Sequence, residues 1–485
     1  MTLDLRALSH SGQQAFAINL QDSFALQIES VVRRVPNKRL VCRGIWNNQP
    51  VYAKLFIGDD AKKYALRDKH GVDCLAQAAL ATPVLLYVGT AKDGKTEVLI
   101  YQAIENCENA EVVYFNQSDL ALRFEIAAKI VSEVAKHHNA SLLQTDLYLK
   151  NFLIKHDVVY TLDGDGIRQY AKLSERQALK NLSVLLSKFD VLEIEHWLAS
   201  LVKVYVDIRG WETAPNLARI ENLVNLHRKK VANNYADKKV FRPCTDVRIY
   251  QQGDFFSAIS ARFFLKSLPS SLQDYDALIA SQPRIKSGNT CTVALAKIDG
   301  IAVVIKRYNI KSFWHGVNRA VRQTRAAVSW ANAHRLILLG IATAAPIALI
   351  EQHRFGLRGK AYFLSEYLEA PDVSEFFSQV TDSASREETV TNIANLFYRL
   401  YLLQISHGDM KSSNIKIIDN QPFLIDLDSM RQHGFAWTAV NAHAKDLRRF
   451  MQNWQEVPAL YNAFIKALKA VYADHQPLQL AHIVQ

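Results

Sequence analysis

The sequence predicts an α+β protein made of two tandem copies of one fold, each with a small antiparallel-sheet lobe followed by a larger helical lobe. Two observations carry this prediction: a repeated spacing of polar residues, and a shared order of strand-like and helix-like segments around each repeat. The length agrees, because 485 residues suit two domains of roughly 240 better than one. With 49% apolar and 22% charged residues, each half can bury a core, which excludes general disorder.

The repeated spacing places four polar residues in the same order in each half. An Asp is followed five residues later by Asn, twelve residues further by a second Asp, and two beyond that by a third. The members are Asp146, Asn151, Asp163 and Asp165 in the first half, and Asp409, Asn414, Asp426 and Asp428 in the second. One Lys ends an apolar run upstream of each set, Lys54 in VYAKLF and Lys306 in VVIKRY. We therefore predict a first domain over 1–245, a junction over 246–275 and a second domain over 276–485.

The segments around the two sets follow one order. Each copy begins with short β-rich runs joined by a turn, which are RLVCRGIW and PVYAKLF in the first copy and TVALAKI and IAVVIKRY in the second. A helical stretch follows, over about 60–80 and 313–340, and then two more strands, PVLLYVG and EVLIYQAI or PIALIEQ and AYFLSEYL. Helical periodicity dominates after that, in LRFEIAAKIVSEVAKHH and TNIANLFYRLYLLQIS. This order is typical of protein-kinase-like folds.

The repeated residues are of the types that phosphoryl transfer from ATP requires. That reaction needs a cation on the nucleotide phosphates, oxygen ligands for Mg²⁺ and a carboxylate beside the acceptor hydroxyl. The expected roles are phosphate contact for Lys54 and Lys306, hydroxyl orientation for Asp146 and Asp409, and Mg²⁺ binding for Asn151, Asp163, Asn414 and Asp426. In the second copy His407 and Lys411 also fall at the His and Lys of the kinase catalytic loop. A lone Asp-x4-Asn is usually a turn or a helix cap, so the prediction depends on the whole pattern occurring twice.

The second copy resembles the bacterial lipopolysaccharide core kinases, a family of sugar kinases with a protein-kinase-like fold. The segments that carry the resemblance are IKSGNTCTVALAKIDGIAVVIKRYN, WANAHRLILLGIATAAPIAL, ISHGDMKSSNIKII and PFLIDLDSM. The first copy is similar to the same family through KRLVCRGIWNNQPVYAKLF and LLQTDLYLKNFLI. The resemblance implies ATP and Mg²⁺ as cofactors and a heptose or Kdo hydroxyl of the lipopolysaccharide inner core as acceptor. It also implies a place at the cytoplasmic face of the inner membrane of a Gram-negative bacterium.

The helix acid that kinases pair with the strand Lys differs between the copies. In the first copy Asp68 is the candidate, because it lies on the apolar stripe of the helix that follows Lys54. In the second copy no Asp or Glu occurs between Asp299 and Glu351, so Lys306 has no such partner on its helix. Either a later acid substitutes, or this copy binds nucleotide differently.

The turn that would cover the nucleotide phosphates has few glycines. The second copy has only Gly288, in KSGNT, and the first copy has none in RRVPNKR. The basic residues of that first segment are either substitutes for backbone phosphate contacts or solvated hairpin charges. The residue before the proposed catalytic Asp is Thr145 or Gly408 rather than Arg, so we do not expect control by an activation-loop phosphate bound to that Arg.

A competing nucleotide motif is present in the first copy. GTAKDGKT, from Gly89 to Thr96, satisfies the P-loop pattern, whose chemistry requires that the Lys and Thr open a helix. Strand-like runs flank it on both sides, and Asp93-Gly94 is a strong hairpin dipeptide. We therefore predict a β-hairpin there.

The net charge of +11 favours anionic partners without choosing among phosphates, acidic lipid and nucleic acid. The basic stretch 227–239 has neither zinc-ligand spacing nor an aromatic ladder beside it, so we expect no nucleic acid partner. Segment 313–328 gathers arginines on one helical face and apolar residues on the other. That pattern suits either packing on the sheet lobe or contact with an anionic inner-membrane surface.

Several features favour a cytoplasmic protein that is peripheral on the membrane. The five cysteines are scattered, the first residues lack a secretory signal, and the longest uncharged run, 336–350, is too short to span a bilayer. Two alternatives to a sugar kinase stay open: a protein Ser/Thr kinase of the same fold, and a non-catalytic pseudokinase scaffold that binds lipopolysaccharide or a protein. Inactivity of one domain also stays open, since the second copy lacks the helix acid and the first has the weaker QTD loop.

Overall fold

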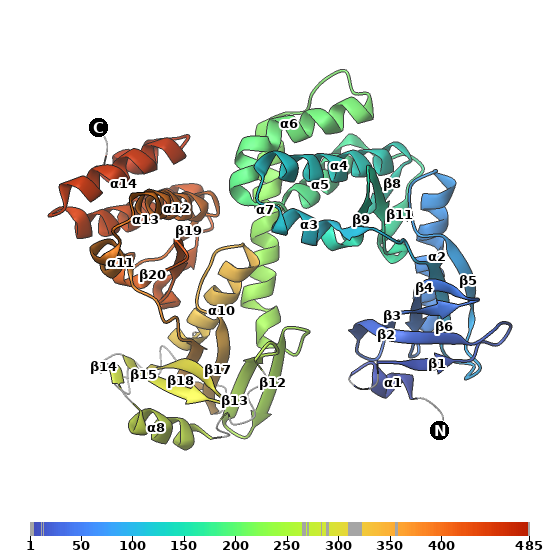
Figure 1. Ribbon diagram of the computed structural model, residues 1–485, viewed down its shortest axis with the longest axis horizontal. Helices are drawn as coiled ribbons and strands as arrows, with labels where there is room; N and C mark the ends of the chain where they lie inside the picture. Colours follow the sequence, from blue (N-terminus) through green and yellow to red (C-terminus); the bar gives the residue numbers. More distant parts are fainter. Residues whose placement is uncertain are drawn as a thin grey trace. The chain divides into compact units, whose positions relative to one another are not determined.

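The computed structural model describes residues 4–10, 12, 14–263, 268, 271–282, 284–287, 291–308, 323–354 and 357–483. The chain separates into two compact units. Residues 1–189 and 193–227 form the first unit, and residues 190–192 and 228–485 form the second. Each unit contains an antiparallel sheet and a helical part, which the ribbon diagram shows as two lobes of the unit (Figure 1). The α+β character predicted from the sequence is therefore confirmed.

The sheet of the first unit is antiparallel throughout, in the order β1-β2-β3-β4-β6-β5. Its strands are β1 (Phe16–Ile18), β2 (Leu26–Val35), β3 (Arg39–Trp46), β4 (Gln49–Phe56), β5 (Leu85–Thr90) and β6 (Glu97–Gln102). Side chains alternate between the two faces of each strand. In β4, Ala53 and Leu55 join a core on one face, while Phe56 joins a second core with helix α2 (Ala61–Gln77) on the other. The short helix α1 (Leu5–Leu8) contributes Leu5 and Leu8 to the core on the first face.

The helical part of the first unit also contains a three-stranded sheet, β10-β9-β7, and a two-stranded sheet, β11-β8. Its helices are α3 (Ala110–Asn116), α4 (Leu120–Asn139), α5 (Glu175–Leu186), most of α6 (Val191–Arg209) and the first half of α7 (Leu217–Asp237), whose residues 228–237 belong to the second unit. Its short strands are β7 (Glu108–Asn109), β8 (Leu142–Gln144), β9 (Phe152–Lys155), β10 (Val158–Thr161) and β11 (Ile167–Gln169). Asp119 caps the N-terminus of α4, where its carboxylate accepts hydrogen bonds from the first amides of the helix, and Ser174 caps α5 in a capping box with Gln177. The loop between β8 and β9 holds Asp146 and Asn151.

The second unit repeats this order of elements. Its antiparallel sheet runs β12-β13-β17-β18-β16-β15-β14. The strands are β12 (Val247–Gln252), β13 (Phe255–Ser260), β14 (Arg284–Ser287), β15 (Cys291–Ile298), β16 (Ile301–Tyr308), β17 (Pro346–Arg354) and β18 (Leu357–Glu366). Helix α8 (Leu272–Ser281) and helix α10 (Arg325–Leu338) accompany the sheet. The described part of the helix expected over 313–340 is α10, and residues 309–322 lie outside the described residues.

The helical part of the second unit follows its sheet. It comprises α11 (Val373–Gln379), α12 (Ser383–Leu402), α13 (Ala436–Met451), α14 (Pro458–Val471) and α15 (Gln476–Leu480). Two short antiparallel pairs follow, β19 (Ile405–Ser406) with β22 (Arg431–Gln432) and β20 (Ile415–Ile418) with β21 (Gln421–Leu424). The polar set lies in the loops that connect β19 to β20 and β21 to β22. The two pairs correspond in order to β8 with β11 and to β9 with β10.

The segment around 228–260 packs with the second unit. Val240 is buried in the hydrophobic core of the second unit. The indole Nε1 of Trp330 donates a hydrogen bond to the backbone carbonyl of Val240 at 3.1 Å. Strand β13 pairs with β17, so residues that the sequence analysis assigned to a junction lie inside the second sheet. The reason is physical: a run such as VRIYQQGDFFSAIS resembles any exposed hairpin until its sheet partner is known. The predicted limits at 245 and 275 remain a prediction.

The P-loop-like segment forms a hairpin, as predicted. Strand β5 ends at Thr90 and β6 begins at Glu97. Between them Asp93 accepts hydrogen bonds from the backbone amides of Lys95 and Thr96, and Gly94 has a φ of 66°. This geometry has no helix N-terminus to hold phosphates.

Candidate functional site

The structure brings Lys54 of the first unit together with two carboxylates. On β4 the side chain of Lys54 leaves the face opposite to Ala53 and Leu55, toward helix α2. Its Nζ lies 2.6 Å from Oδ2 of Asp68 and 3.0 Å from Oδ1 of Asp163. The Tyr101 hydroxyl donates to the other oxygen of Asp68 at 2.6 Å. The predicted pairing of Lys54 with an acid on the following helix is therefore present.

Arg39 adds a second cation to this cluster. Its Nη1 lies 3.5 Å from Asp163 and 3.6 Å from Asp68. Burial acts to raise the pKa of Asp163, but the nearby Lys54 and Arg39 charges outweigh it and hold that pKa below its usual range. For Asp68, which is fully buried, burial dominates and raises the pKa. Arg39 belongs to the basic segment that the sequence analysis left open between phosphate contact and solvated charge, and here it faces the carboxylates.

The backbone around Asp163 is fixed by close packing. Asp163 has φ 66° and ψ 76°, a left-handed conformation that Asp tolerates better than most residues. The next residue, Gly164, lies against α2, where an added Cβ would be 2.2 Å from the carbonyl oxygen of Asp68. Only a glycine fits this approach, so the carboxylate of Asp163 is held at a defined distance from α2.

The loop that carries Asp146 is closed by Asn151. The Nδ2 of Asn151 donates to the carbonyl oxygen of Asp146 at 2.8 Å, which fixes the orientation of the amide and hence of its Oδ1. Asn151 is buried, whereas Asp146 is exposed. A carboxylate that is open to solvent beside a fixed amide can receive an acceptor hydroxyl without first losing a protein partner.

The second unit holds its predicted residues in a similar arrangement. Nζ of Lys306 lies 2.7 Å from Oδ1 of Asp426, which also has a left-handed backbone with φ 64° and ψ 57°. Burial acts to raise the pKa of Asp426, but Lys306 outweighs it and the pKa is lowered. Asn414 donates to the carbonyl of Asp409 at 2.8 Å, and Nζ of Lys411 lies 3.3 Å from Oδ2 of Asp409. Two contacts are therefore common to both units: that of the strand Lys with an Asp, and that of the Asn with the carbonyl five residues before it.

The helix acid is absent from α10, as the sequence predicted. Arg67 on α2 pairs with Asp165, and Arg325 on α10 pairs with Asp428, the matching member of the second set. Counting from these arginines, the position of Asp68 corresponds to Ala326. Glu351, the next acid along the chain, bonds Thr324 and His353 instead of Lys306. Among the described residues, Asp426 is the acid that Lys306 contacts.

Asp446 is a site residue that the sequence analysis missed. It lies on α13, is 4% exposed, and accepts hydrogen bonds from the backbone amides of His407 at 2.6 Å and Gly408 at 2.9 Å. These amides directly precede Asp409, so Asp446 positions the loop. An acid among the apolar residues of an amphipathic helix was the available signal. In the first unit Asn181 of α5 holds the matching place by donating to the carbonyl of Gln144 at 2.9 Å.

The donor sets fit Mg²⁺ with ATP. Mg²⁺ commonly takes one or two carboxylates from the protein and further oxygens from phosphates and water. Each unit offers an Asp in contact with a Lys, and an Asn whose side chain is held in the preceding loop. No cluster of three or more His, Cys, Asp or Glu residues suited to a metal occurs in the described parts of the chain. Gly288, predicted to contact phosphates, lies outside the described residues, as does most of segment 313–328.

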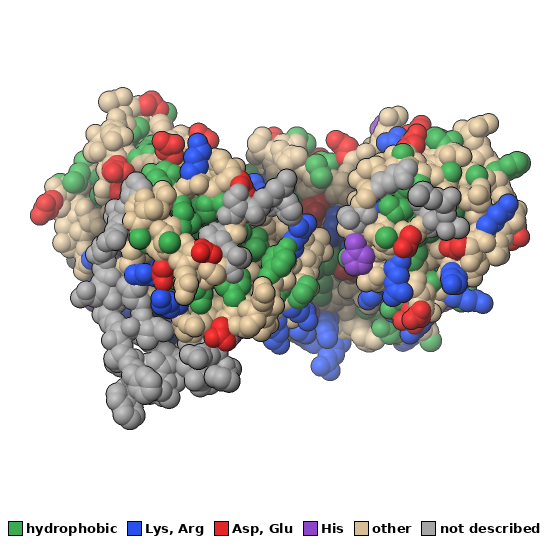
Figure 2. Space-filling view, turned by 90° about the horizontal axis from the view of Figure 1, so that it is seen from below, with side chains coloured by type: hydrophobic (Ala, Val, Ile, Leu, Met, Phe, Trp, Pro, Cys, Tyr) green, Lys and Arg blue, Asp and Glu red, His purple; other side chains and the backbone are tan. Residues whose placement is uncertain are grey.

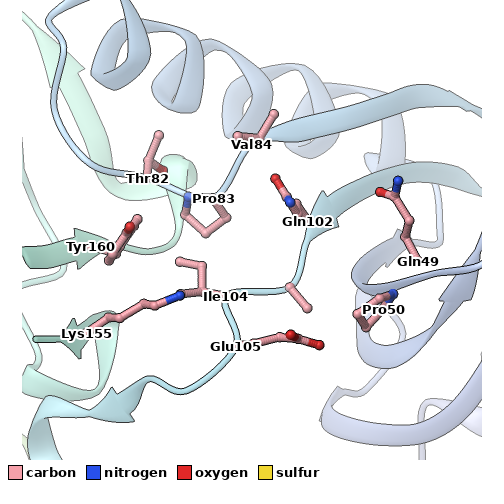
Figure 3. A pocket seen from close by; sticks show the side chains of 11 residues that line it. Gln49, Pro50, Thr82, Pro83, Val84, Gln102, Ile104, Glu105, Lys155 and Tyr160 are labelled. Carbon is pink, nitrogen blue, oxygen red and sulfur yellow. The ribbon is translucent and has the colours of Figure 1, made fainter.

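A pocket of about 390 Å³ lies beside the linker that follows β6 (Figure 3). Gln102 follows Tyr101 on β6 and therefore points to the opposite face of the strand. The side chains of Glu105 and Lys155 border the pocket, and Thr82 and Pro83 form another side (Figure 3). None of the predicted site residues lines it.

Basic and acidic side chains are interspersed over the face shown in the space-filling view (Figure 2). The excess of positive charge is thus not gathered into one continuous basic face on that side. None of the helices within the described residues combines the length and the apolar character needed to cross a bilayer.

Comparison with known proteins gives one family match. Residues 284–472 match the model of the lipopolysaccharide kinase (Kdo/WaaP) family. A solved structure, "WaaP in complex with acyl carrier protein", aligns with 48% of this chain and 93% of its own, at 14% identity and a TM-score of 0.33. No curated protein matches the chain. The resemblance to the lipopolysaccharide core kinases is thereby confirmed for the second unit, whose residues 284–472 carry the sequence pattern of the lipopolysaccharide kinase (Kdo/WaaP) family.

Proposed function

We propose that this chain is a tandem kinase that uses ATP and Mg²⁺ to phosphorylate a hydroxyl of a lipopolysaccharide inner-core sugar, heptose or Kdo. The family match of residues 284–472 supports the reaction and the acceptor class. The observation that carries the proposal for both units is the duplicated contact of a strand Lys with an Asp in the left-handed conformation, Lys54 with Asp163 and Lys306 with Asp426.

The roles of the residues follow from their contacts. Lys54 and Lys306 would bind the nucleotide phosphates, and Asp163 and Asp426 with Asn151 and Asn414 would hold the metal. Bound Mg²⁺ would supply neutralisation of the charge on the transferred phosphoryl group. Asp146 and Asp409 would orient the acceptor hydroxyl and take its proton. In the second unit Lys411, next to Asp409, would contact the phosphoryl group from the acceptor side.

The first unit keeps Asp68 as an anchor for Lys54, while the second unit uses Asp426. An anchor that is separate from the metal ligand leaves Asp163 available to the metal when Lys54 contacts phosphate. In the second unit the same Asp would have to serve both partners. We propose that both units transfer phosphate. In the second unit Asp446, rather than a helix acid, would hold the site in place by fixing the loop before Asp409.

A second function has one observation in its favour. Ala326 at the position of the helix acid suits a pseudokinase scaffold, in which the second unit binds lipopolysaccharide or a partner without transferring phosphate. We also propose that the protein works in the cytoplasm at the inner face of the inner membrane, because its acceptor class is made there.

The transfer reaction is tested with γ-labelled ATP, Mg²⁺ and dephosphorylated core lipopolysaccharide. Asp146→Asn and Asp409→Asn remove one proposed base each, and we expect each to lower transfer from its own unit by roughly 10²-fold or more. The double variant should be inactive. If the label appears on protein substrates and not on the sugar, the acceptor is a protein and the sugar assignment is wrong. Full activity in Asp409→Asn with none in Asp146→Asn would identify the second unit as a scaffold.

A further inference from the structure

Two lysine side chains converge on one aromatic ring beside Asp146 in the first unit. Nζ of Lys188, just past the end of α5, lies 4.3 Å from the centroid of the Tyr148 ring, and Nζ of Lys150 lies 5.0 Å from it. Tyr148 is two residues after Asp146 and is 38% exposed. Because an ammonium group is attracted to the face of an aromatic ring, Tyr148 gathers both positive charges at this loop.

The second unit is built differently at the same position. Counting from the proposed base, Tyr148 corresponds to Lys411, which contacts the carboxylate of Asp409 at 3.3 Å. In the first unit a ring stands where that lysine would be. The positive charges come instead from Lys150 in the same loop and from Lys188 on another element. Positive charge is thus retained near this loop, where both ammonium groups lie over the ring of Tyr148.

Acids also face this ring. Burial together with the carboxylates of Asp146 and Glu111 raises the pKa of Tyr148, so both carboxylates act on the phenol. The loop therefore presents a carboxylate and a pair of ammonium groups around one side chain. A ligand that carries a hydroxyl and a nearby negative group would meet both, with the hydroxyl on Asp146 and the negative group on the lysines.

We propose that Lys150 and Lys188 bind an anionic group of the acceptor in the first unit, next to the hydroxyl that Asp146 orients. This inference rests on the proposed function and narrows its acceptor to a sugar that bears a phosphate or a carboxylate close to the reacting hydroxyl. Lys411 of the second unit contacts the catalytic carboxylate instead, so the two units differ in the acceptor they prefer.

The test uses the full chain with Asp409→Asn, so that transfer reports the first unit. The probes are a core heptose oligosaccharide with and without its phosphate, and a Kdo glycoside as the free carboxylate and as the methyl ester. Binding is measured by calorimetry without nucleotide, and KM and kcat are measured with Mg·ATP. We expect Lys150→Ala and Lys188→Ala each to weaken binding of an anionic probe by roughly tenfold or more, and to leave the neutral probe unchanged. The anionic probe that responds identifies phosphate or carboxylate as the source.

Matched variants distinguish the contribution of the Tyr148 ring from that of its hydroxyl and from that of exposed lysines in general. Lys203→Ala removes an exposed lysine of the same unit, 2.8 Å from Asp207, and should change nothing. Tyr148→Phe keeps the ring and should bind normally, whereas Tyr148→Leu should lose most of the preference for the anionic probe. The inference would be overturned if the lysine variants lost the same affinity for neutral and anionic probes. It would also be overturned if they raised the KM for ATP and left acceptor binding unchanged.

The two proposals fail separately. If no variant transfers phosphate but the lysine-dependent binding of the anionic probe remains, the proposed function fails and the anion site stands. If transfer proceeds and the lysine variants bind and phosphorylate every probe as well as the parent chain does, the anion site fails and the kinase stands.

Discussion

Lys54 lies 2.6 Å from Asp68, a carboxylate that solvent does not reach. Breaking a buried ion pair by removing one partner leaves an uncompensated charge. We expect Lys54→Met to destabilise the first unit by about 3 kcal/mol, with Arg39 at 3.6 Å compensating only in part. Urea unfolding, followed by hydrogen exchange of peptides from α2 and β4, measures this loss.

The double variant tests the cause of that loss. Lys54→Met combined with Asp68→Asn removes the buried carboxylate charge and keeps an acceptor for the Tyr101 hydroxyl. The double variant should therefore recover more than half of the free energy of unfolding that Lys54→Met loses. Lys203→Met, at an exposed pair with Asp207, should change stability by less than about 0.5 kcal/mol. A double variant no more stable than Lys54→Met would mean that the charge of Asp68 is not what destabilises the single variant.

Asp446 positions the loop that carries Asp409 in the second unit by accepting hydrogen bonds from two backbone amides. Asp446→Ala leaves these amides without their buried acceptor, which costs about 2 kcal/mol. We expect it to lower kcat of the second unit by at least tenfold while the KM for ATP changes little, in a chain whose first unit carries Asp146→Asn. Steady-state kinetics with γ-labelled ATP measures both constants. An unchanged kcat would assign Asp446 to stability alone.

Gly164 and Gly166 form a matched pair beside Asp163. A Cβ at Gly164 would lie 2.2 Å from a backbone oxygen, whereas one at Gly166 would lie 3.6 Å from its nearest atom. We expect Gly164→Ala to displace Asp163 and to lower first-unit transfer about 10²-fold, as a shift of about 1 Å commonly does. Gly166→Ala should keep most of the activity. Equal activity in the two variants would show that the approach of Gly164 to α2 does not set the position of Asp163.

Buried histidines make the first unit sensitive to mild acid. Burial lowers the pKa of His137 to about 3 and that of His138 to about 4, whereas an unfolded His titrates near 6.5. Between these values the unfolded chain binds more protons, so stability falls as pH falls below about 6.5. At pH 5 the loss is roughly 2 kcal/mol per histidine. Glu133, whose pKa burial raises, lies 3.7 Å from His137 and offsets part of it.

Hydrogen exchange of α4 peptides at pH 7 and pH 5, corrected for intrinsic rates, measures this dependence. His137→Gln keeps a polar group near the hydroxyl of Thr161 and removes one titrating ring. We expect its protection to fall less between the two pH values than that of the parent chain. The same fall in both proteins would exclude His137 as the source.

The contacts within each polar set were predictable because its Asp and Asn lie close together in the sequence. An Asp-x4-Asn loop between two short strands closes in one way, so the contacts of Asn151 and Asn414 with the carbonyls of Asp146 and Asp409 follow from the chain itself. The pairing of Lys54 with Asp68 was predictable from an acid on the apolar stripe of α2. Each of these signals lies within one short segment.

Features that depend on distant segments were not predictable. Asp446 reaches the loop of His407 from a helix that begins after Phe435, and no local pattern links the two. The gathering of Lys188 with Lys150 on Tyr148 depends on where α5 ends relative to the loop. Strands β12 and β13 join the second sheet through a pairing with β17, some ninety residues later, so composition alone suggested a junction.

The most direct test of a duplicated nucleotide site is the stoichiometry of Mg·ATP binding, measured by isothermal calorimetry. The parent chain should bind two equivalents of Mg·ATP. Asp163→Asn and Asp426→Asn, which keep the shape of the side chain and tolerate a left-handed backbone, should each bind one, and the double variant should bind none. If the double variant binds Mg·ATP with the affinity and stoichiometry of the parent chain, the Lys–Asp clusters are not the nucleotide sites and the account is wrong.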